Sequence, residues 1–400
     1  MIARRALLGL LPIAALGTLL LRTAAPRTRG DLLFVYNAVS GNASLIRGLD
    51  TDHVQLVELS ALKLGRWNVR IGVLDDQLLT LDTESRRIHA IRLDWVRRRA
   101  GGAGAELASD SVRTFPLRAN LVPYRAVIDR DRVLVDYFAA NRIEAYRWQR
   151  ITGLTYLSEQ ILGNARPLGL SDLAVHGDRV LIAASGISCL ARVCPKEAAA
   201  DPHVFAFQLD RESARVPFGA LSADMRPSNS NSAGLYVHQA TGAVFAISAG
   251  DYRGGYSSIQ RIVDDGQLGP EIRLAANAGA ARGFALDART FMILQFSGEH
   301  VFMFDARADR VVSVLRFDGE QFVAIEAGNR PLSERPKSDL QDVLPDPAKQ
   351  GRFYIVDSKQ EQLLHVMFHP PSALELLSRT SLRTSAYRSS PSWAFWVPSL

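Results

Sequence analysis

The sequence contains few of the residues on which catalytic and metal sites are most often built. Its 400 residues include two cysteines and eight histidines, and only five of its 47 basic residues are lysines. Two cysteines exclude a disulfide-rich scaffold and cannot form a four-cysteine zinc site. The sequence also lacks a Gly-x-Ser-x-Gly elbow, a phosphate-binding glycine-rich loop and a His-Glu-x-x-His helix. No local catalytic signature is therefore present.

The charge pattern does not indicate a nucleic-acid-binding protein. The formal net charge is +6, but the arginines are scattered along the chain. Nucleic-acid binding is typically marked by a basic stripe with interleaved aromatic residues, and the sequence contains no such stripe. We therefore expect no nucleic-acid partner.

The first thirty residues differ from the rest. Arg4 and Arg5 precede an apolar run over residues 6–21, and small and polar residues follow. This order is typical of an export signal, and the arginine pair resembles a twin-arginine signal. We expect residues 1–30 to direct the protein to the periplasm or another extracytoplasmic compartment. An uncleaved signal, tethered to the inner membrane through residues 6–21, is the alternative, although sixteen apolar residues are short for a full span.

Cys189 and Cys194 lie five positions apart in a segment that contains a proline. In an oxidising compartment the simplest interpretation of such a pair is a disulfide that fixes its loop. Free thiols and a chemical role remain alternatives. A metal site would need further ligands, and we predict none.

The body of the chain repeats one pattern. An apolar strand is followed by a short turn rich in Asp, Gly or His, then by a second apolar strand, and usually by a third. Alternating apolar and polar residues over five to eight positions indicate strands, and polar turns between them indicate hairpins. No convincing amphipathic helix is present, and we interpret residues 94–111 as a flexible excursion. The copies recur every ~47–62 residues and cover residues 70–82, 125–137, 172–184, 234–248, 283–295 and 342–357.

The two ends of the body predict a seventh copy. Residues 31–59 contain three apolar segments that fit the second, third and fourth strands of a repeat. The missing first strand is predicted in the C-terminal segment around Trp393, Phe395 and Trp396. Pairing the two chain ends would close a ring and remove exposed sheet edges.

Because of this regular repeat, residues 31–400 resemble the seven-bladed β-propellers. Among these, the chain resembles the exported YVTN and quinoprotein-like propellers. The resemblance implies an all-β domain of four-stranded antiparallel blades around a central channel. It also implies that a ligand or active site would lie at a mouth of that channel.

Aligning the copies places six residues at or within one place of the start of the inner strands: Arg70, Arg125, Asp172, Gly234, Arg282 and Asp342. Guanidinium groups match carboxylates and phosphates, so three arginines and two aspartates around one mouth predict binding of an anionic ligand. The alternative is that these side chains pair with one another and hold neighbouring blades together.

The histidines do not form a metal-binding pattern. His176 and His238 occupy turns where other copies have aspartate. His365 and His369 are four positions apart in a strand, where residues four apart lie about 13 Å from each other. We interpret all four as structural residues.

From these features we predict an exported binding or scaffolding module for a protein partner or a small anionic ligand, and we expect a monomer. The alternative is a propeller-type enzyme, a lactonase, a lyase or a quinone-dependent dehydrogenase, with its site at the channel mouth. The sequence names no cofactor.

Overall fold

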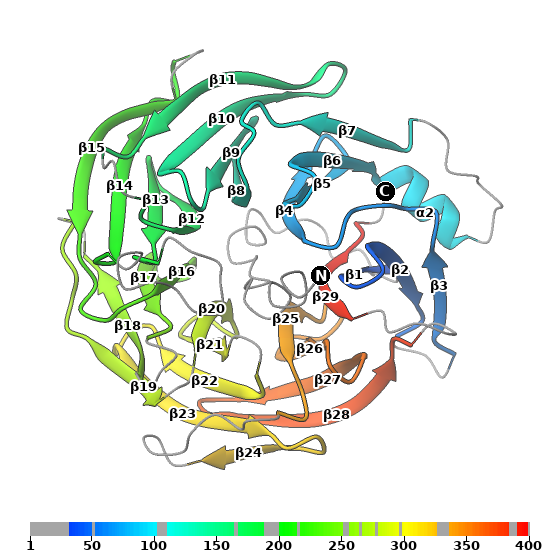
Figure 1. Cartoon of the computed structure of the whole chain (residues 1–400). Coiled ribbons are helices and arrows are strands. Elements are labelled where there is room, and N and C mark those ends of the chain that lie inside the picture. Colours follow the sequence, from blue (N-terminus) through cyan, green and yellow to red (C-terminus); the bar gives the residue numbers. More distant parts are fainter. Residues whose placement is uncertain are drawn as a thin grey trace, which may run out of the picture.

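The computed structural model contains seven β-sheets arranged around a central channel (Figure 1). It describes residues 32–49, 53–101, 110–163, 167–187, 200–213, 217–250, 256–263, 266–276, 279–295, 298–325, 336–383 and 390–398. The predicted export signal and both cysteines, Cys189 and Cys194, lie outside these residues. No helix within these ranges is both long and apolar enough to cross a membrane.

Each sheet is one blade, and all its strands are antiparallel. Blade 1 contains β29 (Pro391–Trp396), β1 (Leu32–Asn37), β2 (Asn42–Arg47) and β3 (Gln55–Leu59). Blade 2 contains β4 (Asn68–Leu74), β5 (Gln77–Asp82), β6 (Arg87–Arg92) and β7 (Val112–Pro116). Blade 3 contains β8 (Pro123–Asp129), β9 (Arg132–Tyr137), β10 (Arg142–Gln149) and β11 (Gly153–Ile161). Blade 4 contains β12 (Leu170–His176), β13 (Arg179–Ala184), β14 (His203–Leu209) and β15 (Phe218–Met225).

Blade 5 contains β16 (Ser232–His238), β17 (Ala243–Ser248), β18 (Tyr256–Ile262) and β19 (Ile272–Ala276). Blade 6 contains β20 (Ala280–Ala285), β21 (Thr290–Gln295), β22 (His300–Asp305), β23 (Arg310–Phe317) and the additional strand β24 (Phe322–Ile325). Blade 7 contains β25 (Leu340–Pro345), β26 (Arg352–Asp357), β27 (Gln362–His369) and β28 (Ala373–Ser381). The inner strands, which face the channel, are β29, β4, β8, β12, β16, β20 and β25 (Figure 1).

The predicted closure of the ring is confirmed. The C-terminal strand β29 pairs with β1, the first described strand of the chain, with Phe34 opposite Phe395. Trp393 is 1% exposed, its ring centroid lies 5.8 Å from that of Phe34 and 5.2 Å from that of Tyr36, and its Nε1 donates to the Asn68 carbonyl at 3.0 Å. Burying this large ring across blades 1 and 2 fixes the C-terminal strand in place.

The turns between inner and second strands follow from the sequence. Asp75 and Asp76 form a two-residue turn with φ of 48° and 61°, the left-handed conformation that hairpin turns of this length require. The equivalent turns are Arg130-Asp131 in blade 3 and Gly177-Asp178 in blade 4. The repeated Asp-Arg pairs therefore lie where two successive hairpins begin their second strands.

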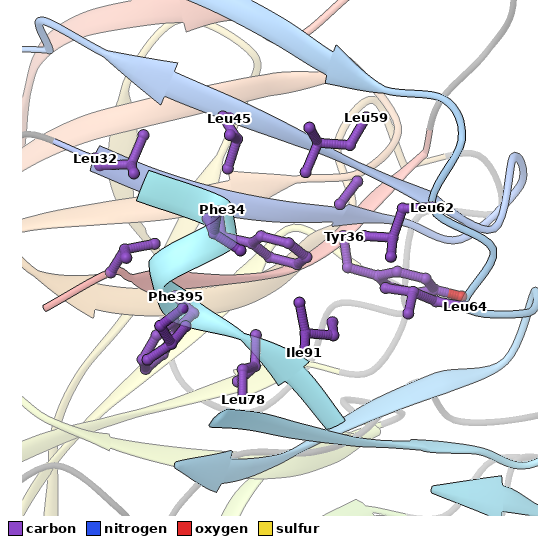
Figure 2. Packing of buried hydrophobic residues seen from close by; sticks show 14 of the residues in the cluster. Leu32, Phe34, Tyr36, Leu45, Leu59, Leu62, Leu64, Leu78, Ile91 and Phe395 are labelled. Atoms are coloured by element: carbon purple, nitrogen blue, oxygen red, sulfur yellow. The ribbon is translucent and has the colours of Figure 1, made fainter. Parts of the chain in front are cut away.

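Apolar side chains between adjacent blades form the core. Figure 2 shows the cluster between blades 1 and 2, where Phe34 and Tyr36 of β1 pack with Leu78 of β5, Ile91 of β6 and Phe395 of β29. These five residues are 0–6% exposed. Each blade buries both of its faces against the two neighbouring blades. Side chains that alternate along a strand therefore pack into two interfaces between blades, and neither face of the sheet is turned to solvent.

One helix was not predicted from the sequence. Residues 94–111 were expected to be an excursion without helical structure, but Leu93–Ala100 form α2, which lies against blade 1. Trp95 and Val96 are buried in the cluster of blades 1 and 2. Arg97 pairs with Asp76 at 3.0 Å, so part of the basic run is engaged in a contact with a turn of blade 2. Eight residues are too few for periodicity to be recognised without this packing.

Candidate functional site

A cavity of about 590 Å³ lies at one end of the central channel. Five inner strands, β4, β16, β20, β25 and β29, contribute the later parts of their length to its wall. The turns that follow β16, β20 and β25 contribute as well. We call it the channel cavity. Its wall is largely apolar and includes Ile71, Val73, Val237, Phe284, Leu286, Val343, Phe353, Phe395 and Trp396.

Two features keep this wall apolar and open. Gly72 and Gly283 are lining residues without side chains, and a Cβ on Gly283 would lie 2.4 Å from Cγ of Tyr236. The tyrosine ring therefore occupies the space beside β20. Trp396 is held in place because its Nε1 donates to the Pro345 carbonyl at 2.9 Å. The wall is thus formed from side chains whose positions are fixed by neighbouring blades.

The sequence-predicted residues form a ring deeper in the same channel. Equivalent positions in six inner strands are occupied by Arg70, Arg125, Asp172, Gly234, Arg282 and Asp342. Each is the third residue of its strand, where the alignment of the copies placed it at or within one position of the strand start. The inner-strand register shifts beside this position in blades 2 to 7. Such bulges redirect side chains, which here aims charged groups at the neighbouring blade. Of these six residues, Arg70 alone also lines the channel cavity.

Four of the charged residues reach the backbone of an adjacent inner strand. Arg70 donates through Nη1 to the Ala394 carbonyl, and Arg282 donates through Nη1 to the Gln341 carbonyl. Asp172 Oδ2 accepts from the Leu235 amide at 2.8 Å, and Asp342 Oδ2 accepts from the Ala394 amide at 3.0 Å. These contacts match the interpretation in which the ring residues hold neighbouring blades together; binding of an anion by them stays a prediction.

Arg125 is the most enclosed of the three arginines, at 3% exposed. Its Nε lies 3.8 Å from Asp172 Oδ1, its Nη1 donates to the Tyr124 carbonyl at 3.2 Å, and its amide donates to Asp136 Oδ1 at 2.6 Å. Its guanidinium also lies over the Tyr124 ring, 4.5 Å from the centroid. The Arg125 side chain is thus held by contacts with its own blade and with Asp172 of blade 4.

Burial dominates the electrostatics of the ring. It lowers the pKa of Arg282 to about 9, and repulsion from Arg125 adds to this shift, while Asp342 opposes it. Burial also raises the pKa of Asp172 and of Asp342, although nearby arginines and backbone amides oppose that rise. Charges of both signs are therefore kept in a poorly solvated channel, where each lowers the cost of burying the other.

The histidines are engaged in pairs within their blades. His365 Nε2 lies 3.2 Å from Asp346 Oδ2, His369 Nε2 lies 2.7 Å from Glu375 Oε2, and His238 Nδ1 lies 2.9 Å from Thr241 Oγ1. His176 ends β12 at the turn where the sequence placed it. Within the ranges given above, no group of three or more potential ligands is arranged to hold a metal ion.

Two of the cations that line the channel cavity, Lys349 and Arg352, were not predicted from the sequence. Lys349 and Arg352 lie at the turn between β25 and β26 and both contribute to the wall. A signal was available, since Lys349 is one of only five lysines and Arg352 follows three positions later in a turn adjoining an inner strand. The sequence repeat does not show which turns lie around the cavity, however, because that depends on how the blades are arranged in the ring.

Comparison with known proteins gives structural neighbours but no sequence relatives. No protein-family model matches the chain, and no curated protein matches its sequence. A streptogramin B lyase structure aligns with a TM-score of 0.51 at 10% identity, over 79% of this chain and 83% of the other. A catalytically inactive virginiamycin B lyase from Staphylococcus aureus with quinupristin gives 0.52 at 11% identity, over 82% and 93%. The dihydro-heme d1 dehydrogenase NirN in complex with DHE gives 0.53 at 12% identity, over 95% and 78%.

Identities this low establish a common fold and leave activity open. The arrangement of seven blades, the pairing of the C-terminal strand with β1 and these structural neighbours agree on that fold. The chain is a seven-bladed β-propeller.

Proposed function

We propose that the protein is an exported binding module that takes a small molecule with an apolar body into the channel cavity. The observation that carries the proposal is a cavity of about 590 Å³ whose wall is built mainly of apolar side chains. Small-molecule sites in proteins typically measure about 300–1,000 Å³ and combine apolar walls with a few polar groups.

The carboxylates of the wall favour binding over catalysis. Asp287 Oδ1 accepts the amides of Arg289 and Thr290 at 2.7 and 2.6 Å. Asp346 Oδ1 accepts the Ala348 amide at 2.8 Å, while its Oδ2 faces His365. Both groups thus stabilise hairpin turns, as the sequence pattern suggested. The enzymatic alternative and a protein partner stay predictions.

The proposal is tested with a neutral apolar dye, N-phenyl-1-naphthylamine, whose fluorescence rises on entering an apolar site. Ala285 lines the cavity on the inner strand of blade 6, and Ala324 is exposed on β24 of the same blade. We expect Ala285→Trp to weaken dye binding at least ~10-fold, about 1.4 kcal/mol, because the indole fills the cavity. Ala324→Trp is the matched control and should leave binding within about twofold of wild type.

A wild-type protein that does not bind the dye, or an Ala285→Trp variant that binds it as well as wild type, would contradict the proposal. Thermal unfolding of both variants checks that the ring remains folded. The export part of the proposal rests on residues 1–30. Fractionation of the native host, followed by N-terminal sequencing of the protein, tests it and separates a cleaved signal from a tether.

A further inference from the structure

Lys349 and Arg352 are the two cations of the channel cavity that remain without a partner. Lys349 is exposed and Arg352 is half-buried, and both line the wall. Among the residues that the structure describes, neither side chain forms an ion pair or a hydrogen bond. Both charges are therefore available to a ligand.

Other arginines near this end of the channel are already paired. Arg97 donates to the carbonyl of the lining residue Pro398 at 2.7 Å and pairs with Asp76 at 3.0 Å. Arg289, in the turn that follows β20, pairs with Asp305 at 2.7 Å. Within the described part of the chain, the β25–β26 turn is thus distinguished from its surroundings by two cations that form no ion pair.

The two carboxylates of the cavity wall do not neutralise the charges of Lys349 and Arg352. Asp346 precedes Lys349 in the same turn, but it is 6% exposed and faces His365 and the Ala348 amide. Asp287, on blade 6, caps its own turn through two backbone amides. The backbone of Lys349 contributes a hydrogen bond to Asp346, but among the described residues neither carboxylate forms an ion pair with the side chain of Lys349 or Arg352.

Aromatic side chains line the cavity together with these cations. Phe353 follows Arg352 in β26, and Phe395 and Trp396 come from the neighbouring inner strand β29. Tyr354 supports Trp396 in an edge-to-face contact, with ring centroids 5.6 Å apart. At the inner end, the Arg70 guanidinium lies 5.9 Å from the centroid of Phe395. An aromatic wall with unpaired cations at its outer edge is suited to a molecule that is apolar at one end and anionic at the other.

We propose that the channel cavity binds a small aromatic organic anion, with its carboxylate or sulfonate held by Lys349 and Arg352 and its ring against Phe353, Phe395 and Trp396. Arginine presents a planar fork of donors that matches such oxyanions, and lysine adds a point charge. This assignment rests on the proposed function and specifies the class of ligand. It differs from the earlier prediction because the anion lies at the outer end of the cavity instead of at the buried ring.

Two dyes that share one scaffold test the assignment. 1-Anilinonaphthalene-8-sulfonate carries a sulfonate, and N-phenyl-1-naphthylamine is the same molecule without it. For the Lys349→Gln/Arg352→Gln double variant at low ionic strength, we expect sulfonate-dye affinity to fall about 10-fold, the loss of one or two charge-assisted hydrogen bonds. Affinity for the neutral dye should change less than about twofold, because the aromatic wall is intact.

The matched control removes the same net charge elsewhere. Lys63 and Arg226 are both exposed, and neither lines the cavity. The Lys63→Gln/Arg226→Gln double variant should bind both dyes as wild type does, which separates local contact from the overall charge of the protein.

Three outcomes would overturn the assignment. If the cavity double variant binds the sulfonate dye unchanged, or loses both dyes equally, the anion is not held by Lys349 and Arg352, while binding of the neutral dye still supports the proposed function. If the control double variant weakens the sulfonate dye as strongly, the effect comes from overall charge. If neither dye binds wild-type protein, the proposed function fails together with this inference.

Discussion

The early and late parts of three inner strands, β4, β20 and β25, differ in chemistry although they belong to the same strand. The third residue is charged in five of the seven blades, and its side chain contacts adjacent backbone or an opposite charge. Two positions or fewer further along, residues such as Ile71, Phe284 and Val343 line an apolar cavity. Charged groups are thus placed where a neighbouring blade satisfies them, and apolar groups where the strands line the cavity. The same strands therefore contribute both contacts between blades and the wall of the cavity.

Blade 1 provides an internal contrast within the ring. Its third inner-strand residue is Trp393, where five other blades carry Arg or Asp. The tryptophan stabilises the ring by burial and stacking, whereas Arg282 or Asp342 does so by hydrogen bonds to backbone. The closing strand, which no covalent loop connects to its partner β1, is the one anchored by the largest apolar side chain.

The largest effect is expected from Trp393→Ala. The substitution removes a fully buried ring that packs on Phe34 and Tyr36, so the free energy of unfolding should fall by about 4 kcal/mol. Trp396→Ala is the control in the same strand, because Trp396 is half-buried at the cavity. Urea denaturation measures both. A larger loss for Trp396→Ala would show that the cavity wall, and not the ring, anchors the closing strand.

For Asp342→Ala we expect the free energy of unfolding to fall by about 3 kcal/mol, less than for Trp393→Ala. The carboxylate accepts the amides of Val343 and Ala394, and its charge favours the ionised form of Arg70. Its removal therefore leaves two amides without their acceptor and takes away a negative charge that lowers the cost of burying Arg70. Asp342→Asn keeps an acceptor and should lose less. Thermal and urea unfolding give the comparison. Unchanged stability combined with lost binding of the sulfonate dye would instead make the ring a ligand site.

The smallest effect concerns Asp339, three residues before Asp342. Burial raises the pKa of Asp339 to about 6, against a hydrogen bond from Gln341 that lowers it. A raised native pKa means that the folded state holds this proton more tightly than the unfolded state. Its contribution to stability is therefore fully present below about pH 4 and is lost as pH rises through 6.

Asp339→Asn should remove that loss. We expect the variant to be more stable than wild type at pH 8 by about 2 kcal/mol, since a rise of about two pKa units corresponds to at most about 3 kcal/mol, and equally stable near pH 4. Melting temperatures of the two proteins across this pH range provide the measurement. A variant that is less stable at pH 8 would show that the neighbours of Asp339 favour its charged form. It would contradict the expectation that burial governs the pKa of this residue.

Much of the fold was predictable because propeller blades leave a periodic signal. Alternating strands and Asp-rich turns located the hairpins, and Trp393 identified the closing strand. The helix Leu93–Ala100 and the fifth strand Phe322–Ile325 were not predicted. Both are short elements whose stability comes from packing against a blade, and such packing leaves little trace in a segment of eight or four residues.

The candidate site was predictable only in part. Equivalent positions of Arg70, Arg125, Asp172, Arg282 and Asp342 followed from aligning the copies, but their burial and their backbone partners did not. Lys349 and Arg352 were missed because they looked like ordinary turn residues. Only the ring shows that this turn joins the turns of blades 5 and 6 and the inner strands of blades 1 and 2 around one cavity.

The sequence by itself determined the strands, the turns, the ring closure and the position of one charged residue in most blades, because each of these depends on local periodicity or on one large apolar residue. The tertiary structure alone decided which charges are buried, which backbone groups they contact and which end of the channel opens into a cavity. Those properties arise when seven distant segments converge, so they depend on distances across the ring that no single segment encodes.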